Sequence, residues 1–209
     1  MVRVDFVDAT YAFEFIGGSV CLDLANTVGS RASDEQNEHL KEYADLVEWA
    51  RQGSLATDAH ARHLLAEAAR RPAAAKRTFA EAIALREAIF RAFSARAHGE
   101  KPAAADVERI NAALPRALAH LELAASDEGF VWRFRDEDDA LDCMLWPVAR
   151  SAADLLLGGP AKFGVCEQET CAWLFLDTSK NHSRRWCTMK DCGNRAKAKR
   201  FYKRRKASS

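Results

Sequence analysis

Two cysteine pairs, Cys166-Glu-Gln-Glu-Thr-Cys171 and Cys187-Thr-Met-Lys-Asp-Cys192, stand fifteen residues apart in the last quarter of this 209-residue chain. Thiolates bind Zn²⁺ tetrahedrally, and two pairs brought together from separate chain positions form a closed structural site. The energy of metal binding then replaces the hydrophobic core that so short a segment cannot build. The spacing predicts one structural Zn²⁺ with Cys166, Cys171, Cys187 and Cys192 as its ligands. An iron–sulfur cluster also takes four cysteines and is the weaker alternative, because its usual spacings differ.

The residues between and after the cysteines predict a treble-clef-like finger. Two short strands are expected at Trp173-Leu-Phe-Leu176 and Arg185-Trp186, with a polar loop between them. After Cys192 the pattern becomes helical, and Asn194 is expected to cap this helix. The side chains of the helix that we expect to pack against the metal core are Ala198, Phe201 and Tyr202.

Charge is distributed unevenly along the chain. From Cys166 to Ser209 there are 12 basic and 4 acidic residues, a net charge of +8, whereas the preceding residues hold 19 basic and 26 acidic ones, a net charge of −7. Four thiolates on one Zn²⁺ add about −2, which leaves about +6. So basic a segment predicts a phosphate-binding surface, with double-stranded DNA as the partner. The residues expected to contact DNA are Arg184, Arg185, Arg195, Lys197, Lys199, Arg200, Lys203, Arg204 and Arg205.

The residues before the cysteines predict a mainly helical domain with a small antiparallel sheet, so the fold class is α+β. A strand is expected over residues 11–16, and a hairpin is expected over residues 121–134 around the turn Ser126-Asp-Glu-Gly129. Apolar side chains at helical spacing predict further helices. They cover about residues 19–28, 40–52, 57–70, 72–99, 106–114 and 139–157, and the last of them is bent or begun at Pro147.

Gly158-Gly159-Pro160 is a helix stop signal and predicts a domain boundary. We expect a sensing or dimerisation domain over residues 1–158 and the finger over residues 161–209. The apolar runs are shorter than the roughly 18 residues of a membrane span, and the first residues lack the order of a secretion signal. These patterns predict a cytoplasmic protein that does not enter a membrane. In a reducing cytoplasm, clustered cysteines are more often metal ligands than disulfides. The isolated Cys21 and Cys143 are expected to be buried thiols.

The sequence lacks the patterns of common catalytic sites, and we expect no enzyme. Gly17-Gly-Ser19 has neither the lysine of a phosphate-binding loop nor the second glycine of a nucleophile elbow. His60 and His63 lie three apart on an expected helix and could share a metal, but two solvent-facing side chains explain the spacing better. Asp136-Glu-Asp-Asp139 fits the acidic first turn of a helix.

A small-molecule effector is a further candidate ligand. Several polar side chains fall in or just after an apolar helix, and two tryptophans could form the walls of a pocket. Helix caps and core packing are the alternative explanation for the same residues. The candidate effector-binding residues are Asp23, Asn26, Arg31, Trp49 and Trp146, of which Arg31 could pair with a ligand carboxylate.

Parts of the chain resemble a known bacterial family. Three segments resemble the CGNR zinc finger: Trp173-Leu-Phe-Leu-Asp-Thr-Ser-Lys-Asn181, Arg184-Arg-Trp-Cys-Thr-Met189 and Cys192-Gly-Asn-Arg195. Two more, Phe13-Glu-Phe-Ile-Gly-Gly-Ser-Val-Cys-Leu-Asp-Leu-Ala-Asn-Thr27 and Leu145-Trp-Pro-Val-Ala-Arg-Ser-Ala-Ala-Asp-Leu155, are similar to the ABATE domain that usually precedes this finger. The resemblance implies a stress-associated bacterial transcription regulator whose basic finger binds DNA.

The leading hypothesis is therefore a one-component, zinc-dependent transcription regulator. One finger offers few contacts to DNA bases, which is consistent with a homodimer. The alternative is a small-molecule-binding protein or an enzyme whose basic finger docks RNA or an acidic protein partner. Exposed thiolates in a basic setting also leave open a redox sensor that loses zinc on oxidation.

Overall fold

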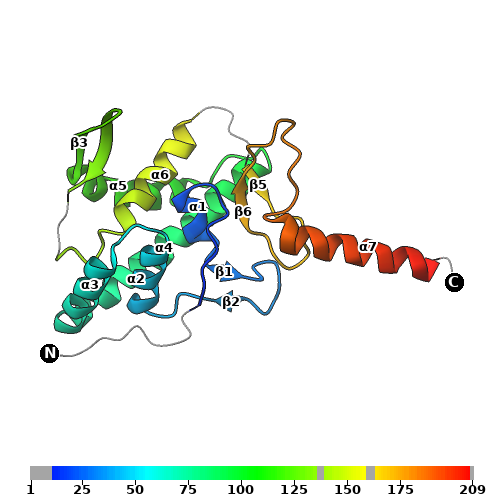
Figure 1. The fold of residues 1–209 in the computed structure, drawn as a ribbon, viewed down its shortest axis with the longest axis horizontal. Helices are drawn as coiled ribbons and strands as arrows, with labels where there is room; N and C mark the ends of the chain where they lie inside the picture. The colour runs from blue at the N-terminus through cyan, green and yellow to red at the C-terminus, as the bar shows by residue number, and fades with distance from the viewer. Residues whose placement is uncertain (1–10, 136–138, 159–162, 208–209) are drawn as a thin grey trace.

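The computed structural model describes residues 11–135, 139–158 and 163–207 (Figure 1). The helices of the body are α1 (Val20–Ala25), α2 (Tyr43–Gln52), α3 (Asp58–Arg70), α4 (Pro72–Ala97), α5 (Ala104–Ala119) and α6 (Leu145–Leu157). In these residues, antiparallel pairs join β1 (Val28–Gly29) to β2 (Asn37–Glu38), β3 (Leu121–Ser126) to β4 (Gly129–Phe134) and β5 (Phe163–Val165) to β6 (Leu174–Leu176). A π-helical turn, η1 (Met189–Gly193), leads into α7 (Asn194–Ala207). The expected α+β class is confirmed.

The long helix α4 is the centre of the body and contacts every other body helix. Its sequence starts at a proline, whose fixed φ suits a first helical position, and continues without glycine or a second proline. Leu85, Ile89 and Phe93 recur every four residues and are buried in the core. At its C-terminal end Phe93 meets Phe163 of β5 edge-on, with ring centroids 4.9 Å apart. The core of the helical body therefore extends into the cysteine-containing segment.

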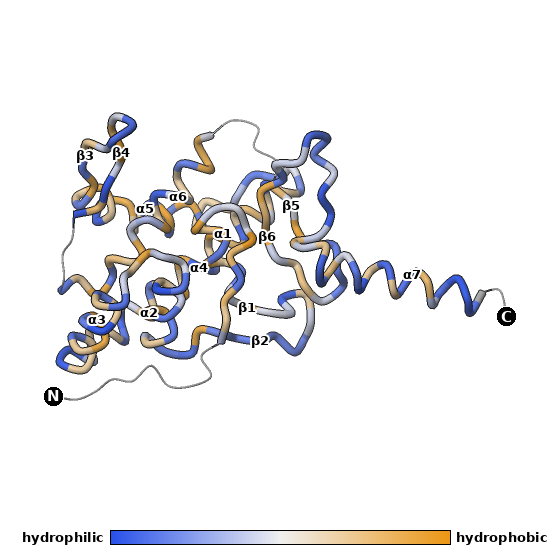
Figure 2. Tube along the Cα trace, viewed as in Figure 1, coloured by the Kyte–Doolittle hydropathy of each residue, from blue (hydrophilic) through white to orange (hydrophobic). Residues whose placement is uncertain are grey.

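Hydropathy separates the body from α7. Figure 2 shows hydrophobic residues gathered inside the helical body, whereas α7 is predominantly hydrophilic and projects away from it. Within the described residues, no helix combines the length and the apolar character needed to cross a membrane.

Two expected body elements are wrong. Residues 11–16 form no strand; the segment lies along α2, where Phe13 N–H donates to Gln52 Oε1 at 2.9 Å and Gln52 Nε2 donates to Tyr11 O at 2.9 Å. The segment therefore forms its hydrogen bonds with the Gln52 side chain and not with a neighbouring strand. An alternating pattern in the sequence does not show whether such a neighbouring strand exists. The last body helix begins at Leu145, not near residue 139, and Pro147 falls in its first turn, where its missing N–H costs no intrahelical bond.

The helix expected to end near Leu114 continues to Ala119 as α5. It passes through Pro115, which the sequence favours as a stop. Ile110 and Ala117 lie seven residues apart on one helical face and are buried in the core. Tertiary packing of this face outweighs the local cost of the proline.

Several expected details of the finger are also wrong. The strand at Leu174–Leu176 pairs with Phe163–Val165, and residues 185–186 form no strand. Asn194 does not cap α7. The turn η1 leads directly into α7, and the Nδ2 atom of Asn194 donates to Lys190 O at 2.8 Å. The side chains expected on the metal core, Ala198, Phe201 and Tyr202, are exposed instead, because α7 extends away from the body.

Candidate metal centre and basic helix

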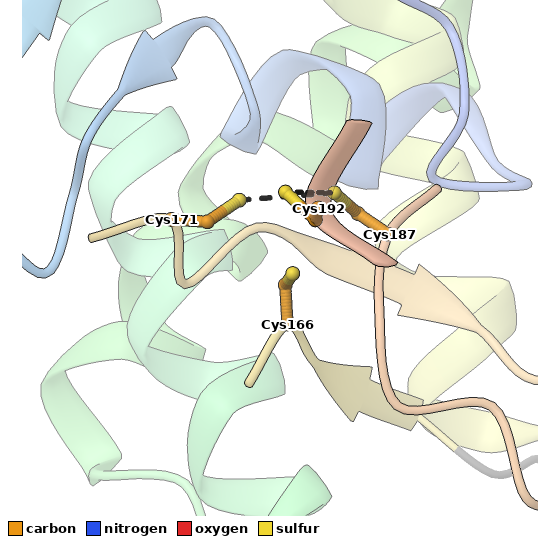
Figure 3. Close-up of side chains that lie close together, drawn as sticks. All are labelled: Cys166, Cys171, Cys187 and Cys192. Atoms are coloured by element: carbon orange, nitrogen blue, oxygen red, sulfur yellow. Dashed lines mark hydrogen bonds between the residues drawn. The ribbon is translucent and has the colours of Figure 1, made fainter. Parts of the chain in front are cut away.

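The four cysteines of the finger converge on one point (Figure 3). Their sulfur atoms all lie within 4.8 Å of one another, and none is in a disulfide. Cys171 Sγ lies 3.7 Å from Cys187 Sγ, which lies 3.5 Å from Cys192 Sγ. The edge of a sulfur tetrahedron around Zn²⁺ is about 3.8 Å for Zn–S bonds of about 2.3 Å. The spacing and the all-sulfur donor set therefore fit one tetrahedral zinc ion.

Short backbone turns hold these cysteines in place. Cys166 follows β5, and its N–H donates to Trp173 O at 2.8 Å, which closes the loop that carries Cys171. Cys192 lies in η1, where Gly193 N–H donates to Thr188 O at 3.0 Å. A Cβ at Gly193 would lie 2.7 Å from the sulfur of the exposed Met189 side chain, so a larger residue there would displace the end of that side chain.

The four thiols lie close enough to change one another's pKa values. Hydrogen bonds from the Cys171 and Cys187 thiols lower the pKa of Cys166 well below its usual range. The same contacts raise the pKa values of Cys171 and Cys187, because each donates its proton to a neighbour. Zn²⁺ binds the thiolate form of cysteine, so metal binding at this cluster would release the thiol protons.

The finger is joined to the body through β6. Asn26 Nδ2 donates to Leu174 O at 2.9 Å, and Leu174 N–H donates to Asn26 Oδ1 at 2.8 Å, so the side-chain amide pairs with the strand as another strand would. Trp173 Nε1 donates to Val28 O at 2.8 Å, and Leu176 N–H donates to Gly17 O at 2.8 Å. Asn26, a candidate effector residue, is therefore fully engaged in holding the finger.

Arg184 also has an internal role in this structure. Its guanidinium donates to the backbone carbonyls of Ile16, Leu176, Trp186 and Cys187. It lies 4.3 Å from the centre of the Phe175 ring, beside the metal cluster. The side chain links the segment before Cys187 to both β6 and the body, and this position differs from that of a solvent-facing DNA contact.

The other basic residues expected at DNA divide into two groups. Arg185 Nε donates to Glu167 Oε2 at 2.7 Å, and Lys199 pairs with Glu169, so the Cys166–Cys171 loop already neutralises two of them. These ion pairs lower the pKa values of both glutamates. The second group lies along α7 and is exposed: Arg195, Lys197, Arg200, Lys203, Arg204 and Arg205.

A groove of about 250 Å³ runs between the Cys166–Cys171 loop and α7. Trp186 lies in it, with Arg185 at 5.2 Å and Arg200 at 5.9 Å from its ring centre. The remaining charged residues that line the groove are Glu167, Glu169, Arg195, Lys199 and Lys203. The groove combines an aromatic surface with an excess of positive charge.

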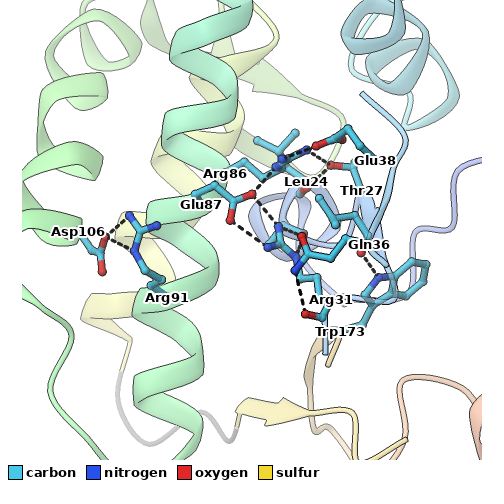
Figure 4. A network of polar contacts seen from close by, with 12 residues as sticks. Leu24, Thr27, Arg31, Gln36, Glu38, Arg86, Glu87, Arg91, Asp106 and Trp173 are labelled. Carbon is cyan, nitrogen blue, oxygen red and sulfur yellow. Dashed lines mark hydrogen bonds and ion pairs between the residues drawn. The ribbon is translucent and has the colours of Figure 1, made fainter. Parts of the chain in front are cut away.

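The remaining candidate effector residues also have internal partners. Arg31 donates to Glu87 at 2.9 and 3.0 Å and to Ala25 O, and lies 4.0 Å from the Phe90 ring centre (Figure 4). Asp23 Oδ1 accepts from Gly17 N–H at 2.7 Å, and burial raises its pKa to about 6. The structure thus supplies Arg31 with a carboxylate of its own.

The two tryptophans lie in separate places. Trp49 is buried in α2 beside Phe15, with ring centroids 6.2 Å apart. Trp146 Nε1 donates to Asp142 Oδ2 at 3.1 Å. Trp146 also lines a cavity of about 220 Å³, and Arg109 and Arg116 of α5 line the same cavity. Of the five candidate effector residues, Trp146 is the one placed at this cavity.

Sequence reasoning missed Arg86, a buried cation of α4 (Figure 4). Its guanidinium donates to both oxygens of Glu38 at 2.7 Å and to Glu87 Oε1 at 2.8 Å. Through Glu87 it shares a carboxylate with Arg31, so the network ties β2, the loop after β1 and α4 together. An Arg-Glu pair within an otherwise apolar helix face is the signal that could have indicated it.

His60 and His63 do not converge on one metal. His63 Nε2 lies 2.9 Å from Asp139 Oδ1, and His60 Nε2 lies 3.8 Å from the half-buried Cys143 sulfur. Glu67 lies close to His63 and Asp139, but it is already paired with Arg70 and Arg71. Residues 136–138 of the acidic run lie outside the described residues.

The other isolated cysteine, Cys21, is buried as expected, and burial raises its pKa to about 11.

A four-thiolate zinc finger fused to a helical body defines the class of this protein, and comparison with protein families gives its family. Residues 18–159 match the ABATE family, described as "Putative stress-induced transcription regulator", and residues 162–205 match the CGNR zinc finger. The chain belongs to the ABATE family and carries a CGNR zinc finger, whose four cysteines form one structural zinc site. Among curated proteins, none matches the chain.

Proposed function

We propose that this protein is a one-component transcription regulator that binds duplex DNA through α7 and the adjoining rim of the finger. It works in the bacterial cytoplasm during stress, and it is not an enzyme. The two domains of the proposal are the body, residues 1–158, and the finger, residues 161–209.

The observation that carries the proposal is the position of α7. The helix starts at the metal centre, two residues after Cys192, and projects away from the body (Figure 1). Basic side chains occur along its length. A zinc-anchored helix with this charge can lie against a phosphate backbone, where Lys and Arg displace condensed counterions. Arg195, in its first turn, is the best placed to reach a base edge, because Arg pairs with guanine through two hydrogen bonds.

The groove beside α7 supports the same proposal. Trp186 offers an aromatic face next to Arg200 and Lys203, a combination that suits a nucleic-acid backbone and its sugars or bases. Arg184 leaves the set of proposed contacts, because its donors are satisfied by carbonyls of the finger and by Ile16 O of the body. The proposed contacts are Arg185, Arg195, Lys197, Lys199, Arg200, Lys203, Arg204 and Arg205.

Effector binding is proposed at the Trp146 cavity of the body. Arg109 and Arg116 contribute positive charge to its lining and Glu81 and Asp142 contribute negative charge, while Arg116 already pairs with Asp142. Arg109 is therefore the proposed partner for the carboxylate of a small molecule whose flat apolar part packs beside the Trp146 indole. Soaking the protein with small aromatic carboxylates while recording Trp fluorescence and thermal midpoints tests the assignment, with Arg109→Ala as the variant that should abolish any shift.

The DNA-binding proposal is tested by selection from random duplexes followed by anisotropy titrations at several salt concentrations. Each lost phosphate contact lowers the magnitude of the slope of log K against log salt by about 0.9, so Lys197→Ala/Lys203→Ala should lower it by about 2. Lys76→Ala/Arg77→Ala removes two exposed charges from α4 and should leave the slope unchanged. A flat salt response, or equal effects of both double variants, contradicts the proposal. Tighter binding to RNA than to any selected duplex favours the alternative of an RNA-docking protein.

A further inference from the structure

The hairpin of β3 and β4 carries an apolar face that remains partly exposed among the described residues. The register pairs Leu121 with Phe134, Leu123 with Trp132 and Ala125 with Phe130. Side chains two residues apart on a strand lie on the same face, so these three pairs form one continuous apolar surface. The opposite face differs, because it carries the Glu122–Arg133 ion pair at 2.7 Å.

The apolar face is anchored at its base and open towards its tip. Phe134 is half-buried and lies 6.2 Å from the Trp146 ring, which fixes the base to the body. Towards the tip, Leu123 is 60% exposed, Trp132 59% and Phe130 74%. A two-stranded hairpin is marginally stable in water by itself, so a free apolar face of this kind calls for a covering partner.

We propose that this face, the hairpin face of Leu123, Phe130 and Trp132, binds the same face of a second copy of the chain. Whole aromatic side chains present roughly 150–250 Å² each, so the exposed parts of the three residues amount to about 400 Å². A standard interface buries about 800 Å² on each partner, and the centre of a homodimer interface is mostly apolar. The hairpin face therefore supplies the apolar half of a dimer interface of ordinary size.

Charge favours a second copy over a strongly charged partner. On the opposite face of the hairpin Arg133 pairs with Glu122, and beside Trp132 Arg150 pairs with Asp154 at 3.2 Å, so these four charges are balanced within one molecule. Away from the acidic turn, two such surfaces meet without net repulsion, and a twofold contact uses the same patch on both subunits.

The tip sets the relative direction of the two hairpins. Asp127 and Glu128 occupy the turn, and two acidic turns placed side by side would repel each other. An antiparallel arrangement avoids this, because the tip of one hairpin then lies over the base of the other.

The position of the hairpin is compatible with the rest of the molecule. Figure 1 shows β3 and β4 at one end and α7 at the other. A dimer formed through the hairpin face leaves both basic helices uncovered. The inference does not depend on DNA binding, and its test uses no nucleic acid.

Sedimentation velocity of the full zinc-loaded chain over a wide concentration range tests the inference. The wild-type protein should dimerise, and Phe130→Ser/Trp132→Ser should weaken self-association by at least about thirtyfold, the effect of truncating an aromatic hot spot. Val131→Ser is the matched control, because Val131 is 47% exposed on the same hairpin but faces the other way. Zinc content and circular dichroism check that each variant is folded.

Hydrogen exchange gives a second measurement on the unmodified protein. Amides of residues 121–134 should exchange more slowly as the protein concentration rises, while those of α3 should not change. A wild-type chain that stays monomeric at the highest concentration overturns the proposal, and the face then belongs to another partner. Equal loss of self-association in Val131→Ser also overturns it.

Discussion

Substitution of Asn26 by alanine tests how firmly the finger is joined to the body. The Asn26 side chain is 2% exposed and holds both the N–H and the carbonyl of Leu174. Leu174 is itself fully buried. Alanine therefore leaves a backbone donor and a backbone acceptor without partners at a place that water does not reach.

The expected loss follows from these two groups. A buried polar group left without a partner costs about 1–3 kcal/mol, so two of them cost about 2–6 kcal/mol. Small shifts of β6 recover part of this, and we expect the free energy of unfolding to fall by about 3 kcal/mol. Zinc should also be lost to a chelator faster, because β6 lies between two of the ligands in the chain.

Urea unfolding of the zinc-loaded protein, followed by circular dichroism, measures the loss. Gln36→Ala is the control, because Gln36 is an exposed amide that donates to Arg31 O at 3.0 Å. A surface change of this kind should alter stability by less than about 0.5 kcal/mol. If Asn26→Ala falls within about 1 kcal/mol of the control, the amide does not join the two parts as described.

Three further outcomes are expected. Because burial raises the pKa of Asp23 from 3.8 to about 6, the folded protein binds this proton more tightly than the unfolded chain, and stability falls as pH rises through that range. Asp23→Asn should thus raise the free energy of unfolding by about 1–3 kcal/mol near pH 8 and leave it unchanged below about pH 4, which urea titrations at both pH values will show. Glu169→Gln releases Lys199 from its ion pair, so on the proposed function it should tighten DNA binding severalfold at low salt and steepen the salt slope by about 1 in anisotropy titrations. Arg184→Ala should lower the thermal midpoint and zinc retention while leaving the salt slope of the remaining folded protein unchanged, and a lower slope in a fully stable variant would show that Arg184 contacts DNA.

The helices and the metal site could be predicted because their signals are local. In α4 the buried positions recur at spacings of three and four residues along the helix, and the hairpin of β3 and β4 has both alternation and turn residues. The cysteine spacing limits the chemistry to a small set of ligands. In each case the residues that determine the structure lie within a short stretch of the sequence.

The contacts between distant segments could not be predicted in the same way. The strand β5 has three residues, too few for a periodic signal, and its pairing with β6 closes a loop that contains two cysteines. Arg184 and Arg185 are identical neighbours in sequence, yet one is surrounded by backbone carbonyls and the other pairs with Glu167. Their roles depend on where folding places acceptors, which residue type does not reveal.

The strand β6 is shared by two hydrophobic clusters, because neighbouring side chains of a strand point to opposite sides. Trp173 and Phe175 pack with the cysteines, whereas Leu174 belongs to the core of the helical body. A ligand that binds only the folded state stabilises it by RT ln(1 + [L]/Kd), about 1.4 kcal/mol for each tenfold rise in concentration above Kd. Because β6 belongs to both clusters, zinc binding should stabilise the helical body as well as the finger. Cellular zinc supply would then govern how much of the protein survives proteolysis, so metal scarcity would lower its abundance.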